Sequence, residues 1–239
     1  MGNDFFRFKQ FTVRQSGAAM KVGVDSVLLG AWASAVHPVR ILDVGAGTGL
    51  LSLMMAQRYP DAAMDAVEID REAYRQAMDN VVDSPWNGRI HVICDDFINY
   101  AEHCTLRYDL IISNPPYFTA SLKPSDTKRN IARHNDSLPH GQLLFGSAKL
   151  LAPTGVMAVV LPPAEALRFI DAATEHGLFV KRMLHVQSLP SKPVYRMLVE
   201  LSKIEYSRDE QTLYIEKADR SDVTDEYRKL TKDFYLKYK

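Results

Sequence analysis

Four consecutive residues, Asn114-Pro115-Pro116-Tyr117, have the side chains and the backbone to hold a flat amino group. The two prolines fix the backbone φ angle and cannot donate, so the carbonyl groups before them point outward instead of joining a sheet ladder. The side-chain oxygen of Asn114 and the carbonyl oxygen of Pro115 can each accept one hydrogen of a planar NH2 group, and the ring of Tyr117 can stack on it. The motif therefore predicts a rigid acceptor site at the end of a strand.

A second site is predicted where three glycines, Gly45, Gly47 and Gly49, alternate after an apolar run that contains Asp43. Glycines at this spacing let the backbone turn tightly and lie against a ligand. The third glycine of the dinucleotide fingerprint is missing, which disfavours NAD. About 20 residues further on, Glu68 ends the next strand, where a carboxylate can accept both hydroxyl hydrogens of a ribose. Asp43 is expected to receive an ammonium group or to order the glycine turn.

These sites need a parallel sheet to position them, because parallel strands present their carboxyl ends at one edge. From Arg40 onward, short β-rich runs alternate with helical stretches, which predicts an α/β domain with one doubly wound sheet and helices on both faces. The expected helices are 24–36, 50–58, 71–82, 141–151, 164–176 and one from Ser221 onward. The seven expected strands are 40–44, 64–69, 90–94, 108–113, 156–161, 179–186 and 197–204.

The composition predicts an ordinary globular protein of 239 residues, 46% apolar and 24% charged. No apolar run approaches the roughly 18 residues of a membrane span, and the N-terminus does not look like a secretory signal. Two cysteines form neither a CxxC pair nor a disulfide framework, so we expect a reduced, cytoplasmic setting. We expect one domain overall, with residues 1–38 as an N-terminal extension or lid on the domain of residues 39–239.

The stretch from Asp43 to Gly49, together with Glu68, resembles the first two motifs of class I S-adenosylmethionine-dependent methyltransferases. The resemblance implies a Rossmann-like fold with a mostly parallel sheet, and S-adenosylmethionine as the cofactor. It implies that the cofactor is held by Asp43, Gly45, Gly47 and Glu68.

The same resemblance makes the residues after the third strand, Asp95, Asp96 and Phe97, candidates to contact the adenine of the cofactor. Which of the two adjacent aspartates makes the contact is left open by the sequence. No clustered His and Cys spacing indicates a metal, so no metal site is expected.

Asn114-Pro115-Pro116-Tyr117 is also the signature of methyltransferases that act on adenine N6, and of those that methylate a glutamine amide in peptide release factors. An exocyclic amine of adenine is a poor nucleophile because its lone pair is delocalised into the ring. Acceptors that hold both hydrogens favour pyramidalisation at nitrogen, so positioning and fixed dipoles can catalyse the transfer without a metal or a strong base. Both substrates carry a planar NH2 group, so the motif does not separate them.

The segment from Phe5 to Trp32, which includes Met20-Lys21-Val22-Gly23-Val24-Asp25-Ser26, looks like the N-terminal signature of the tRNA1(Val) adenine-N6 methyltransferase family. The likeness extends over nearly the whole chain and implies methylation of the adenosine 3′ of the anticodon. It also implies that Lys21 contacts the cofactor or closes over it. The alternatives are a release-factor glutamine methyltransferase and a non-catalytic RNA-binding adaptor. Release-factor enzymes carry a helical N-terminal domain, and the first 38 residues here are too few to form it.

Basic and acidic residues balance at 29 each, so any grip on RNA phosphates must come from a local patch. Residues 1–21 and residues 117–135 each carry four lysines or arginines against one aspartate. The sequence therefore predicts tRNA as the partner and leaves the oligomeric state open. The expected RNA-binding residues are Arg7, Lys9, Arg14, Lys123, Lys128, Arg129, Arg133 and His134.

Overall fold

A computed structural model of the chain describes residues 4–16, 21–116 and 138–238. The strands are β1 (Phe5–Arg7), β2 (Thr12–Arg14), β3 (Arg40–Val44), β4 (Ala63–Glu68), β5 (Ile90–Cys94), β6 (Tyr108–Ser113), β7 (Leu151–Leu161), β8 (Phe179–Gln187), β9 (Val194–Ser202) and β10 (Asp209–Tyr214). The helices are α1 (Val24–Trp32), α2 (Leu50–Arg58), α3 (Arg71–Val82), α4 (Phe97–His103), α6 (His140–Leu150), α7 (Pro163–Glu175) and α8 (Asp225–Thr231).

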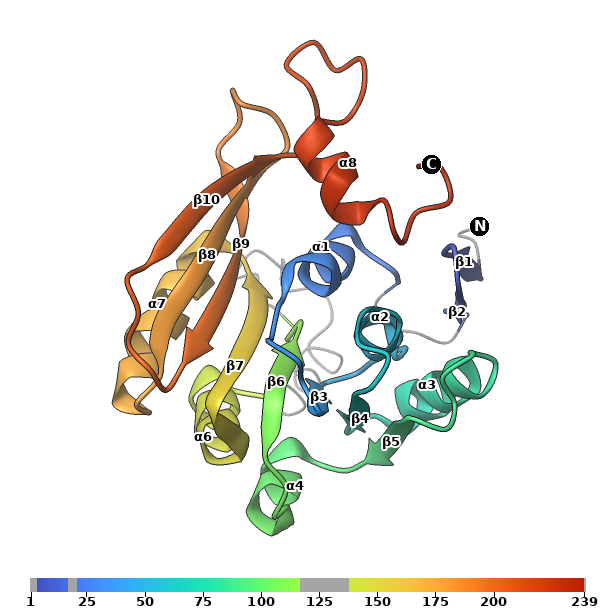
Figure 1. Cartoon of the computed structure of the whole chain (residues 1–239), viewed down its shortest axis with the longest axis vertical. Helices are drawn as coiled ribbons and strands as arrows, with labels where there is room; N and C mark the ends of the chain where they lie inside the picture. The colour runs from blue at the N-terminus through green and yellow to red at the C-terminus, as the bar shows by residue number, and fades with distance from the viewer. Residues whose placement is uncertain (1–3, 17–20, 117–137, 239) are drawn as a thin grey trace, which may run out of the picture.

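An eight-stranded sheet in the order β10-β8-β9-β7-β6-β3-β4-β5 forms the centre of the molecule (Figure 1). Strand β9 is antiparallel to β7 and β8, and the other pairs are parallel. The Rossmann-like, mostly parallel α/β fold is thus confirmed, but the predicted number of seven strands is wrong. The extra strand, β10, lies at the edge and buries only Leu213, so its sequence lacks the apolar alternation that marks a strand.

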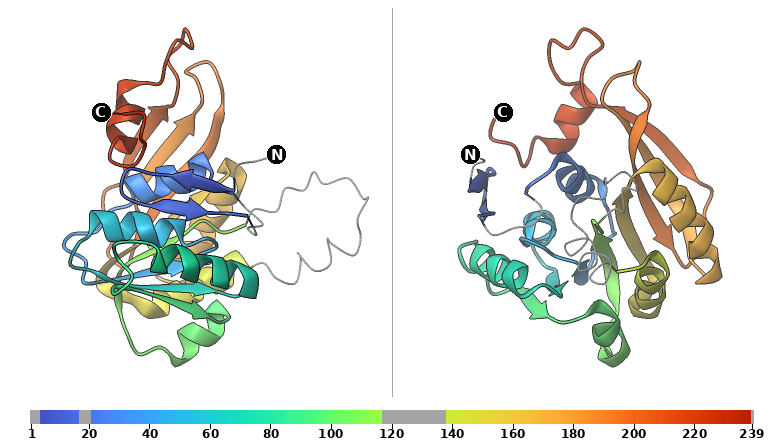
Figure 2. Two further views of the ribbon diagram at one scale, coloured as in Figure 1. Left: turned by 90° about the vertical axis from the view of Figure 1, so that its right-hand side faces the viewer. Right: turned by 180° about the vertical axis from the view of Figure 1, so that it is seen from behind.

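Helices cover both faces of the sheet, as Figures 1 and 2 show, and each face has its own hydrophobic core. Helices α1, α2 and α3 lie on one face, and α4, α6 and α7 lie on the other. Successive residues of a strand point to opposite faces, so Leu110 and Ile112 of β6 join the first core while Ile111 joins the second. This two-sided burial explains why the central strands read as continuous apolar runs.

Local signals set where the helices begin. Helix α3 begins after Asp70, whose Oδ1 accepts hydrogen bonds from the backbone N–H groups of Glu72 and Ala73 at 3.0 and 2.7 Å. Helices α2 and α3 have the predicted limits, whereas the helix expected over 24–36 ends at Trp32. Helix α4 was not expected, because it is short and buries only Phe97 and Ala101.

The first part of the chain packs onto the sheet through α1, which contacts β7 and whose Val27, Leu28 and Leu29 are fully buried. The β1–β2 hairpin is held to the C-terminal segment by the backbone N–H of Lys9, which donates to the carbonyl of Phe234 at 2.8 Å. None of the helices in the described ranges combines the length and the apolar character that a membrane crossing requires.

Candidate active site

The predicted sites meet at one edge of the sheet, because β3, β4, β5 and β6 are parallel neighbours. The glycine loop follows β3, Glu68 ends β4, Asp95 follows β5 and Asn114 follows β6. Each loop leaves the carboxyl end of its strand, where open α/β sheets bind ligands. Residues that lie far apart in the sequence are thereby brought together at one place. Val44 and Ser113, for example, are 69 positions apart.

The glycine loop has the backbone that its composition predicts. Gly45 and Gly47 have positive φ angles of 70° and 56°, which favour glycine. A Cβ atom added at either position would meet no atom of the described chain within 4 Å, so the loop presents open backbone to a ligand. The first residues of the loop are held against the end of β4, since the N–H groups of Gly45 and Ala46 donate to the carbonyl of Val67 at 2.9 and 3.1 Å.

Glu68 connects this loop to the end of β4. Its buried carboxylate accepts the backbone N–H of Gly47 at Oε2 (2.7 Å) and that of Asp70 at Oε1 (2.9 Å). A carboxylate oxygen has a second acceptor position, so both oxygens can also receive the hydroxyl hydrogens of a ribose. The residue therefore shapes the loop as well as offering a binding group.

Asp43 lies beneath the loop and is buried from water. Its Oδ2 accepts the backbone N–H and the hydroxyl of Ser52 at 3.0 and 2.7 Å, which ties β3 to α2. Its Oδ1 has no hydrogen-bond partner among the described residues. Burial raises the pKa of Asp43 to about 7, although the hydrogen bonds from Ser52 oppose this shift; the nearby Glu68 charge raises it further. An open glycine backbone, a diol acceptor and an unmatched buried carboxyl oxygen together fit a cofactor with a ribose and positive charge.

The two aspartates after β5 make different contacts. Asp95 accepts the side-chain amide of Asn99 with both oxygens, at 2.9 Å each, and also the backbone N–H of Asp96. Asp96 caps α4, since its Oδ1 accepts the N–H groups of Ile98 and Asn99 at 2.8 and 3.1 Å.

The ring of Phe97 is buried in the second core, where a Cβ atom added at Gly146 would lie 2.6 Å from its Cε1. The ring packs between α4 and α6, so a contact of Phe97 with a ligand at the sheet edge can come only from its backbone.

The acceptor motif stands directly beside the glycine loop. The hydroxyl of Ser113, the last residue of β6, donates to the carbonyl of Val44, the last residue of β3, at 2.8 Å. Asn114 is half-buried, Pro115 is buried and Pro116 is exposed. The Nδ2 of Asn114 donates to Ser26 Oγ at 2.8 Å. Tyr117 lies outside the described residues.

Three further residues at this edge were not found from the sequence. Ser26 on α1 contacts Asn114, and the buried Asn80 on α3 donates to the carbonyl of Thr48 at 2.9 Å, which braces the glycine loop. Ile69, directly after Glu68, is 50% exposed, which is unusual for an isoleucine at the end of a central strand. Ile69 follows a predicted binding carboxylate and Ser26 lies within the N-terminal signature, but neither feature predicted the contact, and Asn80 has no comparable feature in the sequence.

The predicted RNA-binding and lid residues are described in part. Arg7 and Lys9 are exposed on the β1–β2 hairpin, whereas Arg14 forms an ion pair with Asp83 at 2.6 Å. The hairpin lines a groove of about 1010 Å³. Lys21 is exposed. The other expected residues, Lys123, Lys128, Arg129, Arg133 and His134, lie outside the described residues. Within the described ranges, no group of three or more His, Cys, Asp or Glu side chains could hold a metal ion.

Comparison with known structures supports the fold. A predicted O-methyltransferase from Agrobacterium tumefaciens superimposes with a TM-score of 0.67 at 19% identity, covering 88% of this chain and 96% of that one. A putative RNA methyltransferase from Pyrococcus horikoshii superimposes with a TM-score of 0.51 at 22% identity, covering 75% and 81%. At these identities the likeness concerns the fold alone.

Sequence relatives identify the family. The model of the methyltransferase small domain matches residues 22–165. A tRNA1(Val) (adenine(37)-N6)-methyltransferase of Bacteroides fragilis is 48% identical over 99% of this chain and 100% of its own length. The enzyme of that name from Trichodesmium erythraeum is 46% identical over the full length of both chains. The chain therefore belongs to the tRNA1(Val) (adenine(37)-N6)-methyltransferase family.

Proposed function

We propose that this chain transfers the methyl group of S-adenosylmethionine to the N6 amino group of adenine 37 in the anticodon loop of a valine tRNA, the reaction that its relatives are named for. One observation carries the proposal beyond the family name. The Asn114-Pro115 acceptors stand beside the glycine loop, with the two strand ends joined by the 2.8 Å hydrogen bond from Ser113 to Val44. Donor and acceptor of the methyl group can therefore meet over β3 and β6.

The glycine loop and the adjoining carboxylates are suited to the cofactor. Bound S-adenosylmethionine supplies a methyl group on a positively charged sulfur, which is open to attack by a nucleophile. Gly45 and Gly47 allow close approach of their backbone, and Glu68 accepts the ribose hydroxyl hydrogens. Asp43, whose Oδ1 has no hydrogen-bond partner among the described residues, would in its ionised form attract the positively charged part of the cofactor from beneath the loop.

The adenine ring of the cofactor is assigned to the loop after β5. Asp95 is already engaged by the side chain of Asn99 and by the backbone N–H of Asp96, so we assign the amino group of the cofactor's adenine to Asp96, whose Oδ2 accepts no hydrogen bond within the described ranges. The exposed side chain of Ile69 offers an apolar surface to one face of the ring.

Asn114 and Pro115 act on the target base. Their two oxygens each accept one N6 hydrogen, which holds the amino group and increases electron density on its nitrogen. Bound S-adenosylmethionine would supply the methyl carbon that the N6 lone pair attacks, and the electron pair of the broken carbon–sulfur bond would stay on the sulfur, which leaves as a neutral thioether. The proton that N6 then loses passes to water, because an amide and a peptide carbonyl do not take up a proton at neutral pH. Tyr117 remains assigned to stacking on the base from the sequence alone.

The remaining assignments complete the proposal. Arg7 and Lys9 on the hairpin, with the predicted basic residues of segment 117–135, contact tRNA phosphates, and Lys21, which precedes α1, contacts the cofactor. An unpaired loop suits this site, since extruding a base costs least where it is not paired. A tRNA-modifying enzyme with two free cysteines, Cys94 and Cys104, fits a cytoplasmic location.

The experiment is a substrate panel. The purified chain is incubated with radiolabelled S-adenosylmethionine and, separately, with valine tRNA transcript, the same transcript with adenine 37 changed to guanine, a peptide release factor and duplex DNA. We expect label only in the unchanged tRNA, in N6-methyladenosine after digestion. Label in the release factor would show the glutamine-amide reaction instead, and binding of tRNA without any label would show an adaptor.

A further inference from the structure

One hydrogen bond joins the predicted base-holding amide to a helix 88 residues earlier in the chain. The Nδ2 of Asn114 donates to the Oγ of Ser26, at 2.8 Å. The Nδ2 and Oδ1 atoms are the two branches of one planar amide group. With Nδ2 held toward α1, Oδ1 points away from α1, so this contact restrains the direction in which the acceptor oxygen faces.

Ser26 can restrain Asn114 only if its own helix turn is fixed. Gly23, the residue that precedes α1, provides no side-chain cap for that turn. The turn is held instead by an ion pair, in which Asp25 Oδ2 accepts a hydrogen bond from Arg196 Nε at 2.7 Å. The two side chains are only 21% and 25% exposed. Arg196 lies near the start of β9, which reaches the same sheet edge as Asn114, since Met197 pairs with Leu161 at the end of β7.

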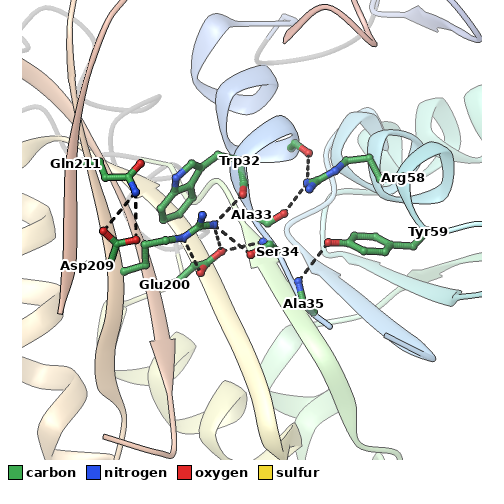
Figure 3. Close-up of polar contacts among 11 residues, drawn as sticks. Trp32, Ala33, Ser34, Ala35, Arg58, Tyr59, Glu200, Asp209 and Gln211 are labelled. Carbon is green, nitrogen blue, oxygen red and sulfur yellow. Dashed lines mark hydrogen bonds and ion pairs between the residues drawn. The ribbon is translucent and has the colours of Figure 1, made fainter. Parts of the chain in front are cut away.

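The other end of α1 is also anchored, as Figure 3 shows around Ser34 and Ala35. Glu200 accepts the backbone N–H of Ser34 at 2.8 Å, and the hydroxyl of Tyr59 accepts the N–H of Ala35 at 3.2 Å. The guanidinium of Arg182 donates to the carbonyl of Trp32 at 2.9 Å. Anchored at both ends, α1 is a rigid support for the Ser26 hydroxyl.

We propose that Ser26 is a positioning residue for methyl transfer, which acts by orienting the Asn114 amide toward the substrate amino group. This inference rests on the function proposed above. Among the described residues, the hydroxyl of Ser26 contacts Asn114 and no residue of the glycine loop, so its removal should slow the chemical step and leave cofactor affinity unchanged. A neutral hydrogen bond contributes about 0.5–1.5 kcal/mol, so the loss corresponds to about a two- to tenfold lower rate.

The test compares Ser26→Ala, Ser26→Val and Ser26→Thr with the wild type. Threonine and valine have nearly the same shape, but only threonine keeps the hydroxyl. We expect the single-turnover rate of methyl transfer to fall about two- to tenfold in the Ala and Val variants and to stay near the wild-type value in the Thr variant. The dissociation constant of S-adenosylmethionine, measured by calorimetry, should be the same in all four proteins and reports that each variant is folded.

Ser202→Ala is the matched control. Ser202 is also a serine that accepts one hydrogen bond, from the backbone N–H of Ile204 at 3.0 Å, but it lies at the opposite end of β9. Its removal should leave the single-turnover rate unchanged.

Two results would overturn the inference while the wild type methylates tRNA: wild-type rates in both Ser26→Ala and Ser26→Val, or a Thr variant as slow as the Val variant. An inactive wild type would overturn the proposed function itself, and the inference with it.

Discussion

Asp43 is a carboxyl group placed where water cannot solvate its charge. The two hydrogen bonds from Ser52 stabilise the charged form, but the burial of the side chain outweighs them and raises its pKa to about 7. Its protonated form thus contributes stability that is present at low pH and is lost as the pH rises through the folded-state pKa. Above that pKa, the ionised carboxyl provides a negative charge beneath the glycine loop, and its burial lowers the stability of the cofactor-free protein.

Asp43→Asn should therefore change how stability depends on pH. Between about pH 4 and pH 7 Asp43 binds a proton in the folded protein but not in the unfolded chain, where its pKa is near 3.8, so its contribution to the free energy of unfolding falls with rising pH. The variant lacks this decline, and its stability relative to wild type should rise by up to about 4 kcal/mol across that window. Urea unfolding of the cofactor-free proteins from pH 4 to pH 8 measures the difference, and parallel curves for the two proteins would contradict the raised pKa.

At the scale of single residues, the sequence predicts side chains that carry their own chemical signal. Glu68 and Asn114 could be proposed because their types and neighbours suggest a ribose acceptor and an amino-group acceptor. Ser26 and Asn80 could not be proposed, because their roles depend on partners that the fold brings from far along the chain. A serine in an apolar helix and an asparagine in an amphipathic one have no local feature that marks such contacts.

At the scale of elements, α1 depends on a buried ion pair. Glu200, which is 1% exposed, accepts hydrogen bonds from Arg182 at 2.7 and 3.1 Å as well as from the backbone of Ser34. The guanidinium carbon of Arg182 also lies 4.1 Å from the ring centroid of Trp32, the last residue of α1. The pair thus joins β8, β9 and the end of α1 into one unit.

Glu200→Ala should destabilise the protein strongly, because it leaves a largely buried guanidinium and the Ser34 N–H without their acceptor. We expect a loss of about 3–5 kcal/mol, which lowers the melting temperature by roughly 10 °C in a chain of this size. Arg168→Ala is the control, since Arg168 is 74% exposed in its ion pair with Glu165 and should contribute less than about 1 kcal/mol. Equal melting temperatures for the two variants would refute a supporting role for the Arg182–Glu200 pair.

Elements were predicted well where they have an apolar pattern and a clear end signal. Helix α3 has both, with Asp70 as its cap. Strand β10 has neither, because an edge strand needs few buried side chains and its position is set by pairing with β8. Helix α4 is too short for a periodic pattern to appear, so only its cap at Asp96 marks it.

At the scale of the whole molecule, a chain with no net charge has to concentrate its cations to bind RNA. Arg7 and Lys9 are exposed on the hairpin beside the groove, while Arg14 is engaged with Asp83. The division into an extension of residues 1–38 and a domain of residues 39–239 remains a prediction. The family assignment, in contrast, rests on relatives that align over the full length.

Removing Arg7 or Lys9 should weaken tRNA binding without changing cofactor affinity. Each contact with a phosphate that is lost should reduce the slope of log K against log salt concentration by about 1. Arg14→Ala should change the slope less, because its guanidinium is already paired. Filter binding of valine tRNA at several salt concentrations measures these slopes, and unchanged slopes for both Arg7→Ala and Lys9→Ala would remove the hairpin from the RNA-binding surface.

The most direct test of the account is the single-turnover rate of methyl transfer to valine tRNA by Asn114→Ala, measured alongside its affinity for S-adenosylmethionine. Removing one of two fixed acceptors from a preorganised site should slow transfer by about a hundredfold or more, while the dissociation constant of the cofactor changes by less than about twofold. A variant that methylates adenine 37 at the wild-type rate would contradict the assignment of the β6 motif to the target amino group.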